Sequence, residues 1–128
     1  MSELAAIELK ANLPARDFDL SRQFYKDLGF TECWRNGGLA YFHYGPCGDH
    51  GKVAFLLQDY HVKEVAENLQ MHMLVNDVDA WWKHLDAIEL AQKYGVPMSV
   101  LEDREWGMRD FTVHDPSGVV WCFARYIE

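Results

Sequence analysis

The sequence is poor in cysteine and in positive charge, and it has no long apolar run. Its three cysteines, Cys33, Cys47 and Cys122, are an odd number without CxxC spacing, which predicts a reducing compartment and no disulfide framework. No apolar stretch approaches membrane-spanning length, and the opening Met-Ser-Glu-Leu-Ala-Ala lacks the basic and apolar regions of a signal peptide. We therefore expect a cytoplasmic protein without a membrane partner.

The charge balance is acidic, with 12 Lys and Arg residues against 20 Asp and Glu residues and a formal net charge of −8. This balance makes nucleic acid a poor partner and a cationic ligand a better one. Hydrophobic residues make up 49% of the 128 positions, which excludes general disorder and indicates a single domain with a real core.

Motifs of nucleophilic and phosphate chemistry are missing. The sequence contains no Gly-x-Ser-x-Gly and no phosphate-cradling glycine-rich loop. Its 6 histidines show no HxH or HExxH spacing. Cys122 stands among Val120, Trp121 and Phe123, an apolar setting that leaves a thiol inert. We therefore expect no catalytic nucleophile of these types.

The first half of the chain has the pattern of one strand, one helix and three strands. Alternation over residues 5–12 predicts a strand whose core face carries Ile7, Leu9 and Ala11. Asp17 is the predicted N-cap of a helix that Gly29 ends. The buried stripe of this helix consists of Leu20, Phe24 and Leu28. The strands predicted after the helix are at about 30–35, 39–44 and 52–58.

The same order returns in the second half. Residues 69–76 alternate like the first strand, and Asp77 is the predicted N-cap of a helix that Gly95 ends. The buried stripe of this helix consists of Val78, Trp81, Trp82, Leu85 and Ile88. A strand near 98–102 and a hairpin around Asp-Pro-Ser-Gly at 115–118 follow, because Pro and Gly favour the turn and both arms are aromatic and β-branched.

The two predicted N-caps, Asp17 and Asp77, are 60 residues apart, which is about half the chain. A repeat of this period predicts duplication of one supersecondary unit. The predicted fold class is therefore α+β, with two βαβββ modules at about 5–60 and 68–127 within a single domain, residues 1–128.

Two segments resemble a known superfamily. The first is Asn12-Leu-Pro-Ala-Arg-Asp-Phe-Asp, which leads into a helix that carries Phe-Tyr and ends in Leu-Gly-Phe. The second is Glu105-Trp106-Gly107 followed by Asp-Pro-Ser-Gly at 115–118. Together they resemble the vicinal oxygen chelate superfamily of glyoxalase I, ring-cleaving dioxygenases and bleomycin resistance proteins, and are most similar to the last group. The resemblance implies curved mixed sheets with the helices outside.

The resemblance also bears on metal binding. Enzymes of this superfamily hold a metal ion with His, Gln or Glu at four strand positions, and the metal polarises the substrate. The resemblance puts Lys10 (or Leu9), Phe55, Gln70 and Cys122 at these positions. A protonated Lys only donates, and Gln with Cys does not suit a hard metal ion. No metal and no cofactor are therefore expected.

Aromatic side chains are abundant, with 5 Trp, 6 Tyr and 7 Phe. In bleomycin resistance proteins, flat ligand rings stack on aromatic residues in a groove that two subunits share. The resemblance therefore implies a metal-free homodimer that sequesters a flat cationic small molecule of the bleomycin type. The candidate ligand-binding residues are Trp106, Trp34, Tyr41, His72, Gln70 and Cys122. Pro14 is a candidate hinge from which residues 1–12 cross to the partner subunit.

Two other functions stay open beside the binding protein. The first is a metal-dependent lyase, isomerase or dioxygenase with an atypical ligand set around His72, formed with Glu8 and Cys122. His72 lies two residues after Gln70 and thus on the same strand face. The second is a dimeric interaction module that has no small ligand.

Overall fold

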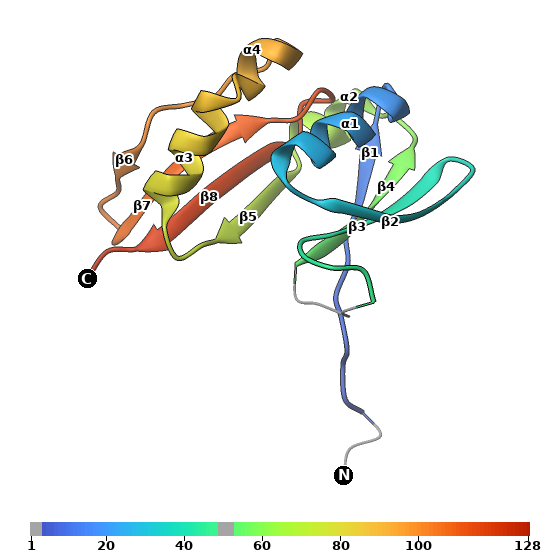
Figure 1. The fold of residues 1–128 in the computed structure, drawn as a ribbon, viewed down its shortest axis with the longest axis horizontal. Helices are drawn as coiled ribbons and strands as arrows, with labels where there is room; N and C mark the ends of the chain where they lie inside the picture. Colours follow the sequence, from blue (N-terminus) through green and yellow to red (C-terminus); the bar gives the residue numbers. More distant parts are fainter. Residues whose placement is uncertain (1–3, 49–52) are drawn as a thin grey trace. The chain divides into compact units, whose positions relative to one another are not determined.

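The computed structural model describes residues 4–48 and 53–128, and the chain divides into two compact units, Met1–His61 and Val62–Glu128. Each unit is built on a four-stranded mixed sheet with helices against it (Figure 1). The α+β class and the strand–helix–strand order of both modules are confirmed. None of the described helices is long and apolar enough to cross a membrane.

The described part of unit 1 contains five elements, which are β1 (Asn12–Ala15), α1 (Phe18–Leu28), β2 (Thr31–Asn36), β3 (Leu39–His43) and β4 (Ala54–Asp59). The strand order is β1-β4-β3-β2, with β1 parallel to β4 and the other pairs antiparallel. The Asp17 carboxylate accepts a hydrogen bond from the Leu20 amide at 3.1 Å and begins α1 as predicted. Gly29, with φ of +120°, ends it.

The core of unit 1 is aromatic and lies between α1 and one face of the sheet. The Tyr25 ring of α1 lies 4.7 Å from the Phe55 ring of β4, and Phe42 of β3 stacks on Phe55 at 5.3 Å. Side chains alternate along β3, so Tyr41 points away from this core on the opposite face of the sheet.

Unit 2 contains seven elements, which are α2 (Lys63–Glu67), β5 (Gln70–Leu74), α3 (Val78–Ala87), α4 (Leu90–Tyr94), β6 (Glu102–Asp103), β7 (Met108–His114) and β8 (Val120–Tyr126). The strand order is β5-β8-β7-β6, with β5 parallel to β8. In the core, Trp81 of α3 stacks on Phe123 of β8 at 4.9 Å. The predicted continuous helix up to Gly95 is wrong, because Glu89 adopts a left-handed φ of 54° and separates α3 from α4.

The predicted hairpin joins β7 and β8. The Asp115 carboxylate, only 1% exposed, accepts hydrogen bonds from the amides of Ser117 (2.8 Å) and Val119 (3.0 Å). Gly118 has φ of +100°, a conformation that a side chain would strain. The turn is therefore fixed by its own residues, which is why the sequence predicts it well.

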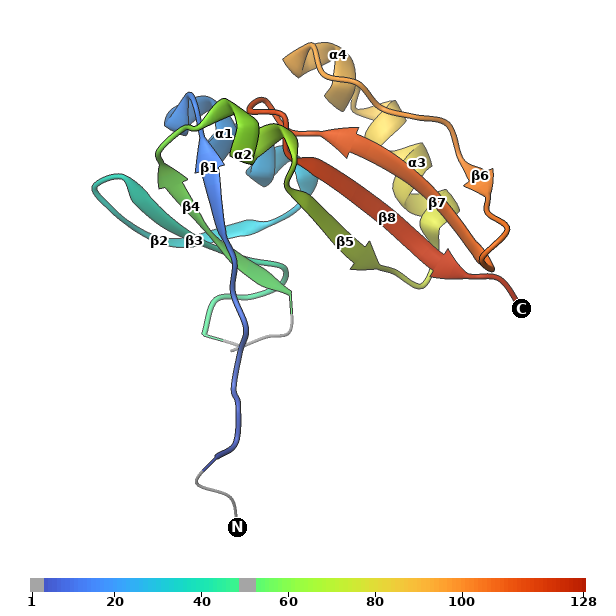
Figure 2. The same ribbon diagram turned by 180° about the vertical axis from the view of Figure 1, so that it is seen from behind.

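The predicted strand over residues 5–12 is wrong, since β1 begins at Asn12. The Ala11 carbonyl still accepts a hydrogen bond from the Leu56 amide, but before it the described chain forms no strand and is an extended segment (Figures 1 and 2). Ile7 and Leu9 are 77% and 92% exposed instead of lying in the core. The predicted strand near 98–102 is reduced to the two-residue β6 and a single bridge at Met98. The start of the predicted strand 52–58 lies outside the described residues.

The expectation of no disulfide is also wrong. Cys33 on β2 is bonded to Cys47 in the segment after β3, with Cα atoms 5.5 Å apart and a sequence separation of 14. Spacing rules do not detect this pair, because the β2–β3 hairpin turns the chain back and brings Cys47 beside Cys33. Cys122 is buried and free.

Candidate ligand-binding faces

Trp34 and Tyr41 form a stacked pair on the face of the unit 1 sheet opposite α1. Their ring centroids lie 6.0 Å apart, with the ring planes tilted by 25°. A β-bulge between Glu32 and Trp34 makes this possible. In a regular strand Glu32 and Trp34, two positions apart, would share a face. Here Glu32 binds Arg22 of α1, whereas Trp34 stacks on Tyr41 on the opposite face. The extra residue in the bulge is Cys33, the disulfide-bonded cysteine.

A buried carboxylate lies beside this aromatic pair. Glu8 has a side chain only 5% exposed, and its two oxygens accept from the Tyr41 hydroxyl and the Lys10 ammonium, each at 2.7 Å. The same ammonium lies 5.5 Å from the centroid of the Tyr41 ring. Burial and the neighbouring Glu8 charge disfavour the phenolate and raise the pKa of Tyr41 to about 12. Tyr41 is therefore a neutral donor at physiological pH.

Three other predicted site residues lie together on the sheet of unit 2. His72 of β5 is the register partner of Cys122 of β8, and Gln70 is the partner of Val120. Strand alternation puts Gln70, His72 and Cys122 on the face opposite the Trp81–Phe123 core. This face of unit 2 therefore carries polar side chains, whereas the Trp34–Tyr41 face of unit 1 is aromatic.

Asp110 and Arg104, which sequence reasoning missed, accompany Cys122. Asp110 of β7 is 6% exposed, and its carboxylate accepts from Arg104 Nε at 2.9 Å. Burial raises the pKa of the Cys122 thiol, and the Asp110 charge raises it further. The available signal was the alternation of β7, where Asp110 lies two residues before Thr112, the register partner of Cys122, and thus on the same face.

Trp106 lies between β6 and β7 and is 69% exposed, against 46% for Trp34. The Arg104 guanidinium lies 5.9 Å from its ring, and Gly107 follows with φ of +83°. A ring so exposed contributes little to a core, and Trp106 belongs to the surface of unit 2. Both tryptophans therefore have ring surface available for stacking.

The four positions of the expected metal ligands do not suit a metal ion. Lys10 is an ammonium paired with Glu8, and Phe55 is a buried core ring. Gln70 and Cys122 share a face, but within the described ranges no group of three His, Cys, Asp or Glu side chains is placed to hold a metal. In the alternative set, the Glu8 carboxylate is engaged by Tyr41 and Lys10.

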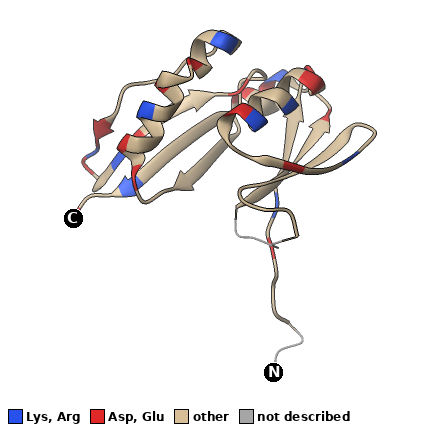
Figure 3. Cartoon of the chain, in the orientation of Figure 1, with Lys and Arg blue, Asp and Glu red and all other residues tan. Residues whose placement is uncertain are grey.

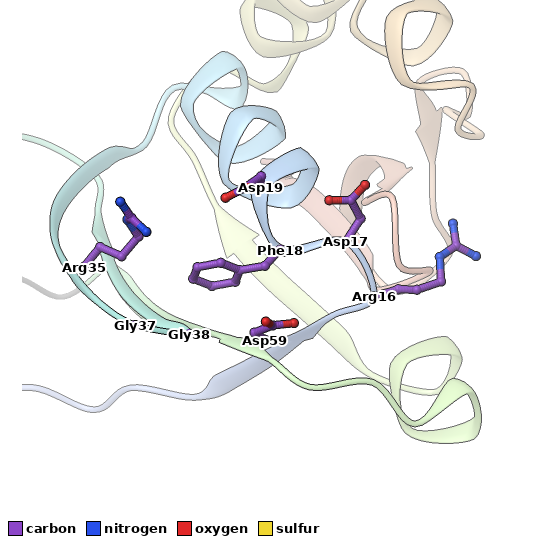
Figure 4. A pocket seen from close by; sticks show the side chains of 8 residues that line it. All are labelled: Arg16, Asp17, Phe18, Asp19, Arg35, Gly37, Gly38 and Asp59. Carbon is purple, nitrogen blue, oxygen red and sulfur yellow. The ribbon is translucent and has the colours of Figure 1, made fainter.

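A separate hollow of about 510 Å³ opens at the start of α1 (Figure 4). Phe18, Arg35 and Asp59 line it, and Gly38 forms part of its wall. A Cβ atom on Gly38 would lie 2.9 Å from the Asp59 Cβ, so this wall admits only glycine without a shift. The hollow is open and mainly polar, and it lacks the stacked rings of the Trp34–Tyr41 face.

The family model of the Glyoxalase/Bleomycin resistance protein/Dioxygenase superfamily matches residues 8–123 of the chain. The chain belongs to this superfamily. A comparison with curated proteins finds no match.

Solved structures of the superfamily resemble this fold. The bleomycin-binding protein from bleomycin-producing Streptomyces verticillus, complexed with copper(II)-bleomycin, has a TM-score of 0.71 at 21% identity, covering 100% of this chain and 99% of that one. A bleomycin resistance determinant encoded on the transposon Tn5 has a TM-score of 0.72 at 19% identity, covering 92% and 97%. Lactoylglutathione lyase from Agrobacterium tumefaciens has a TM-score of 0.65 at 20% identity, covering 97% and 95%. At these identities the likeness shows the fold, which both binding proteins and an enzyme share.

Proposed function

We propose that this protein binds and sequesters a flat cationic small molecule of the bleomycin type, without a metal or cofactor and without altering it. The observation that carries the proposal is the half-exposed Trp34 ring, stacked on Tyr41 beside the buried Glu8 carboxylate. Stacking surface holds a planar ring, and a carboxylate next to it favours a positive charge. Bleomycin-binding proteins among the similar structures support the same class of ligand.

The overall charge supports a cationic ligand as well. The net charge is −8, and Figure 3 shows acidic residues on helices and loops of both units. An acidic protein attracts cations over a distance and thus increases their encounter rate. Trp106 is the proposed stacking residue of unit 2, with Gln70, His72 and Cys122 as the polar residues of the same unit.

A homodimer is part of the proposal. The segment before β1 exposes Leu4, Ile7 and Leu9 at 94%, 77% and 92%. Apolar side chains this exposed on an extended segment suit a partner surface. The predicted hinge at Pro14 is wrong, because Pro14 lies within β1 and pairs with Gln58 of β4, and Glu8 contacts Tyr41 of the same chain. Light scattering at micromolar concentration should give twice the monomer mass, and Ile7→Glu with Leu9→Glu should halve it. A monomeric unmodified protein would contradict the dimer.

Two alternatives stay open beside this proposal. The first is a metal-dependent enzyme with an atypical ligand set around His72, and metal analysis of protein purified without chelator distinguishes it from the binding protein. Stoichiometric metal that is lost in His72→Ala would favour the enzyme. The exposed N-terminal segment alone would suit a dimeric interaction module, which should bind no planar cation.

The decisive experiment is a tryptophan fluorescence titration with 10-methylacridinium, a planar cation, and with acridine, which is neutral at pH 7.5. We expect saturable quenching by the cation and at least severalfold weaker binding of acridine. Equal and non-saturable quenching by both compounds would contradict the proposed function.

The cytoplasm is the proposed compartment, but the cysteine argument for it no longer holds. The Cys33–Cys47 disulfide is of a kind that persists mainly under oxidising conditions. Cell fractionation should place the protein in the cytosolic fraction, and recovery from a secreted or periplasmic fraction would contradict this compartment.

A further inference from the structure

Lys10 makes the contacts that a ligand ammonium would make on the aromatic face of unit 1. Its Nζ lies 2.7 Å from one Glu8 oxygen and 5.5 Å from the centroid of the Tyr41 ring. The second Glu8 oxygen accepts from the Tyr41 hydroxyl, which fixes the orientation of the carboxylate. The carboxylate and the ring thus form a two-sided receptor for a primary ammonium, which combines ion pairing with cation–π attraction.

The receptor is more buried than its occupant. The Glu8 side chain is 5% exposed and the Lys10 side chain 33%. A buried carboxylate is costly unless a cation or donors satisfy it, and Lys10 provides a cation here. Lys10 lies before β1 in a segment that forms no strand, and the preceding residue, Leu9, is exposed and does not pack in the core. Because the Lys10 side chain is partly exposed, it can turn to solvent while the Tyr41 hydroxyl still holds the Glu8 carboxylate.

We propose that Glu8 and Tyr41 form an alkylammonium subsite, and that Lys10 is its internal occupant and competes with the ligand for it. The inference rests on the proposed function for the planar part of the ligand and adds its charged group. The Trp34 ring lies 6.0 Å from the Tyr41 ring and is 46% exposed. This distance is short enough for one ligand to stack its planar ring on Trp34 and place its ammonium group over Tyr41. The ligand class is a planar ring joined to a primary amine by roughly three bonds of about 1.5 Å.

The first experiment tests the subsite without any planar ligand. Lys10→Ala removes the side chain beyond Cβ, and n-propylammonium has the atoms that are lost. We expect saturable shifts of the Trp34 indole N–H resonance by NMR when propylammonium is added to Lys10→Ala, and none in the unmodified protein. Adding Glu8→Gln to Lys10→Ala should abolish the shifts, and 1-propanol should cause none.

Lys63→Ala is the matched control, because it removes one positive charge from an exposed pair in unit 2, 4.0 Å from Glu67. A general effect of net charge would make Lys63→Ala respond like Lys10→Ala. Such equal responses, or a response that survives Glu8→Gln, would overturn the subsite. So would a Lys10→Ala protein that folds by its NMR spectrum and shows no shift.

The second experiment measures competition by Lys10. Lys10→Met keeps the apolar stem and removes the charge, so it should bind 2-(1-naphthyl)ethylammonium about five- to thirtyfold more tightly than the unmodified protein. Affinity for the neutral N-acetyl derivative should not change. Equal gains for both compounds would overturn the competition.

The two experiments separate this inference from the proposed function. Propylammonium binding without binding of either naphthyl compound would support the subsite and contradict the planar ligand. Equal binding of both naphthyl compounds to the unmodified protein and to Lys10→Met, with no response to propylammonium, would support the planar ligand and overturn the subsite.

Discussion

The indole of Trp34 and the phenol of Tyr41 lie on adjacent strands with centroids 6.0 Å apart, and the β-bulge at Cys33 turns the indole to that side. Without the bulge, Trp34 would share the side of Glu32, which contacts α1 through Arg22. One extra residue thus moves a large ring from the helix-covered face to the open face. The stacking surface depends on this local irregularity.

Replacing Trp34 by Ala should weaken binding of 10-methylacridinium about five- to thirtyfold, because a stacked cationic ring contributes about 1–2 kcal/mol. Stability should change by less than about 1 kcal/mol, since the ring is half-exposed. Trp121→Ala is the contrast, because Trp121 is 3% exposed and should lose about 3–5 kcal/mol of stability. Urea unfolding and a fluorescence titration measure both quantities. A Trp34→Ala protein as destabilised as Trp121→Ala would show that Trp34 is a packing residue.

Replacing Trp106 by Ala should also weaken binding about five- to thirtyfold with little loss of stability. The ring is 69% exposed and its described cation contact is Arg104. Arg104→Lys keeps the charge and is the control for loss of that contact. Unchanged binding by Trp106→Ala would remove Trp106 from the site, and a large fall in the unfolding free energy would make it structural.

Opening the Cys33–Cys47 disulfide should destabilise the protein by about 3 kcal/mol, the value expected for a closed loop of about 15 residues. Cys33 is the bulge residue, so the double variant Cys33→Ser with Cys47→Ser should also weaken binding at Trp34. Thermal unfolding with and without dithiothreitol measures the first effect. Cys122→Ser controls for the loss of a thiol. An identical melting temperature in all these conditions would contradict a structural disulfide.

The Arg22 hydrogen bonds hold the pKa of Glu32 below its usual 4.5 in the folded protein. A lowered folded pKa stabilises the fold above pH 4.5, and this contribution is lost as pH falls through the folded value. Glu32→Gln should therefore cost about 1–3 kcal/mol at pH 7. The difference from the unmodified protein should shrink steadily below pH 4.5.

Urea unfolding at several pH values measures the Glu32 effect. Glu67→Gln is the control, because its exposed pair with Lys63 at 4.0 Å should contribute little at any pH. A Glu32→Gln deficit that stays constant down to pH 3 would show that the ion pair is not its cause.

The elements that the sequence predicts well are those fixed by nearby residues. The two Asp N-caps and the Asp115 turn each satisfy backbone amides within four positions, so local chemistry is enough. The prediction of a strand over residues 5–12 is wrong although these residues alternate as in a strand. Backbone hydrogen bonds to β4 reach only as far back as Ala11. Partner length is a long-range property that alternation does not contain.

The site is partly predictable for the same reason. Tyr41, Gln70, His72 and Cys122 fall on the sheet faces opposite the aromatic cores once strand periods are assigned. The place of Trp34 depends on a bulge, and the Cys33–Cys47 and Glu8–Lys10 pairs depend on how loops and the N-terminal segment fold back. Such contacts leave no periodic signal.

The most direct measurement of the central claim is an NMR titration of the five Trp indole N–H groups with 10-methylacridinium. We predict saturable shifts for the half-exposed Trp34 and the exposed Trp106, and small shifts for the buried Trp121 and for Trp82, whose indole donates to the Ser99 carbonyl at 2.9 Å. Saturable shifts confined to other tryptophans, or no saturable shift at all, would contradict the binding of planar cations at these faces.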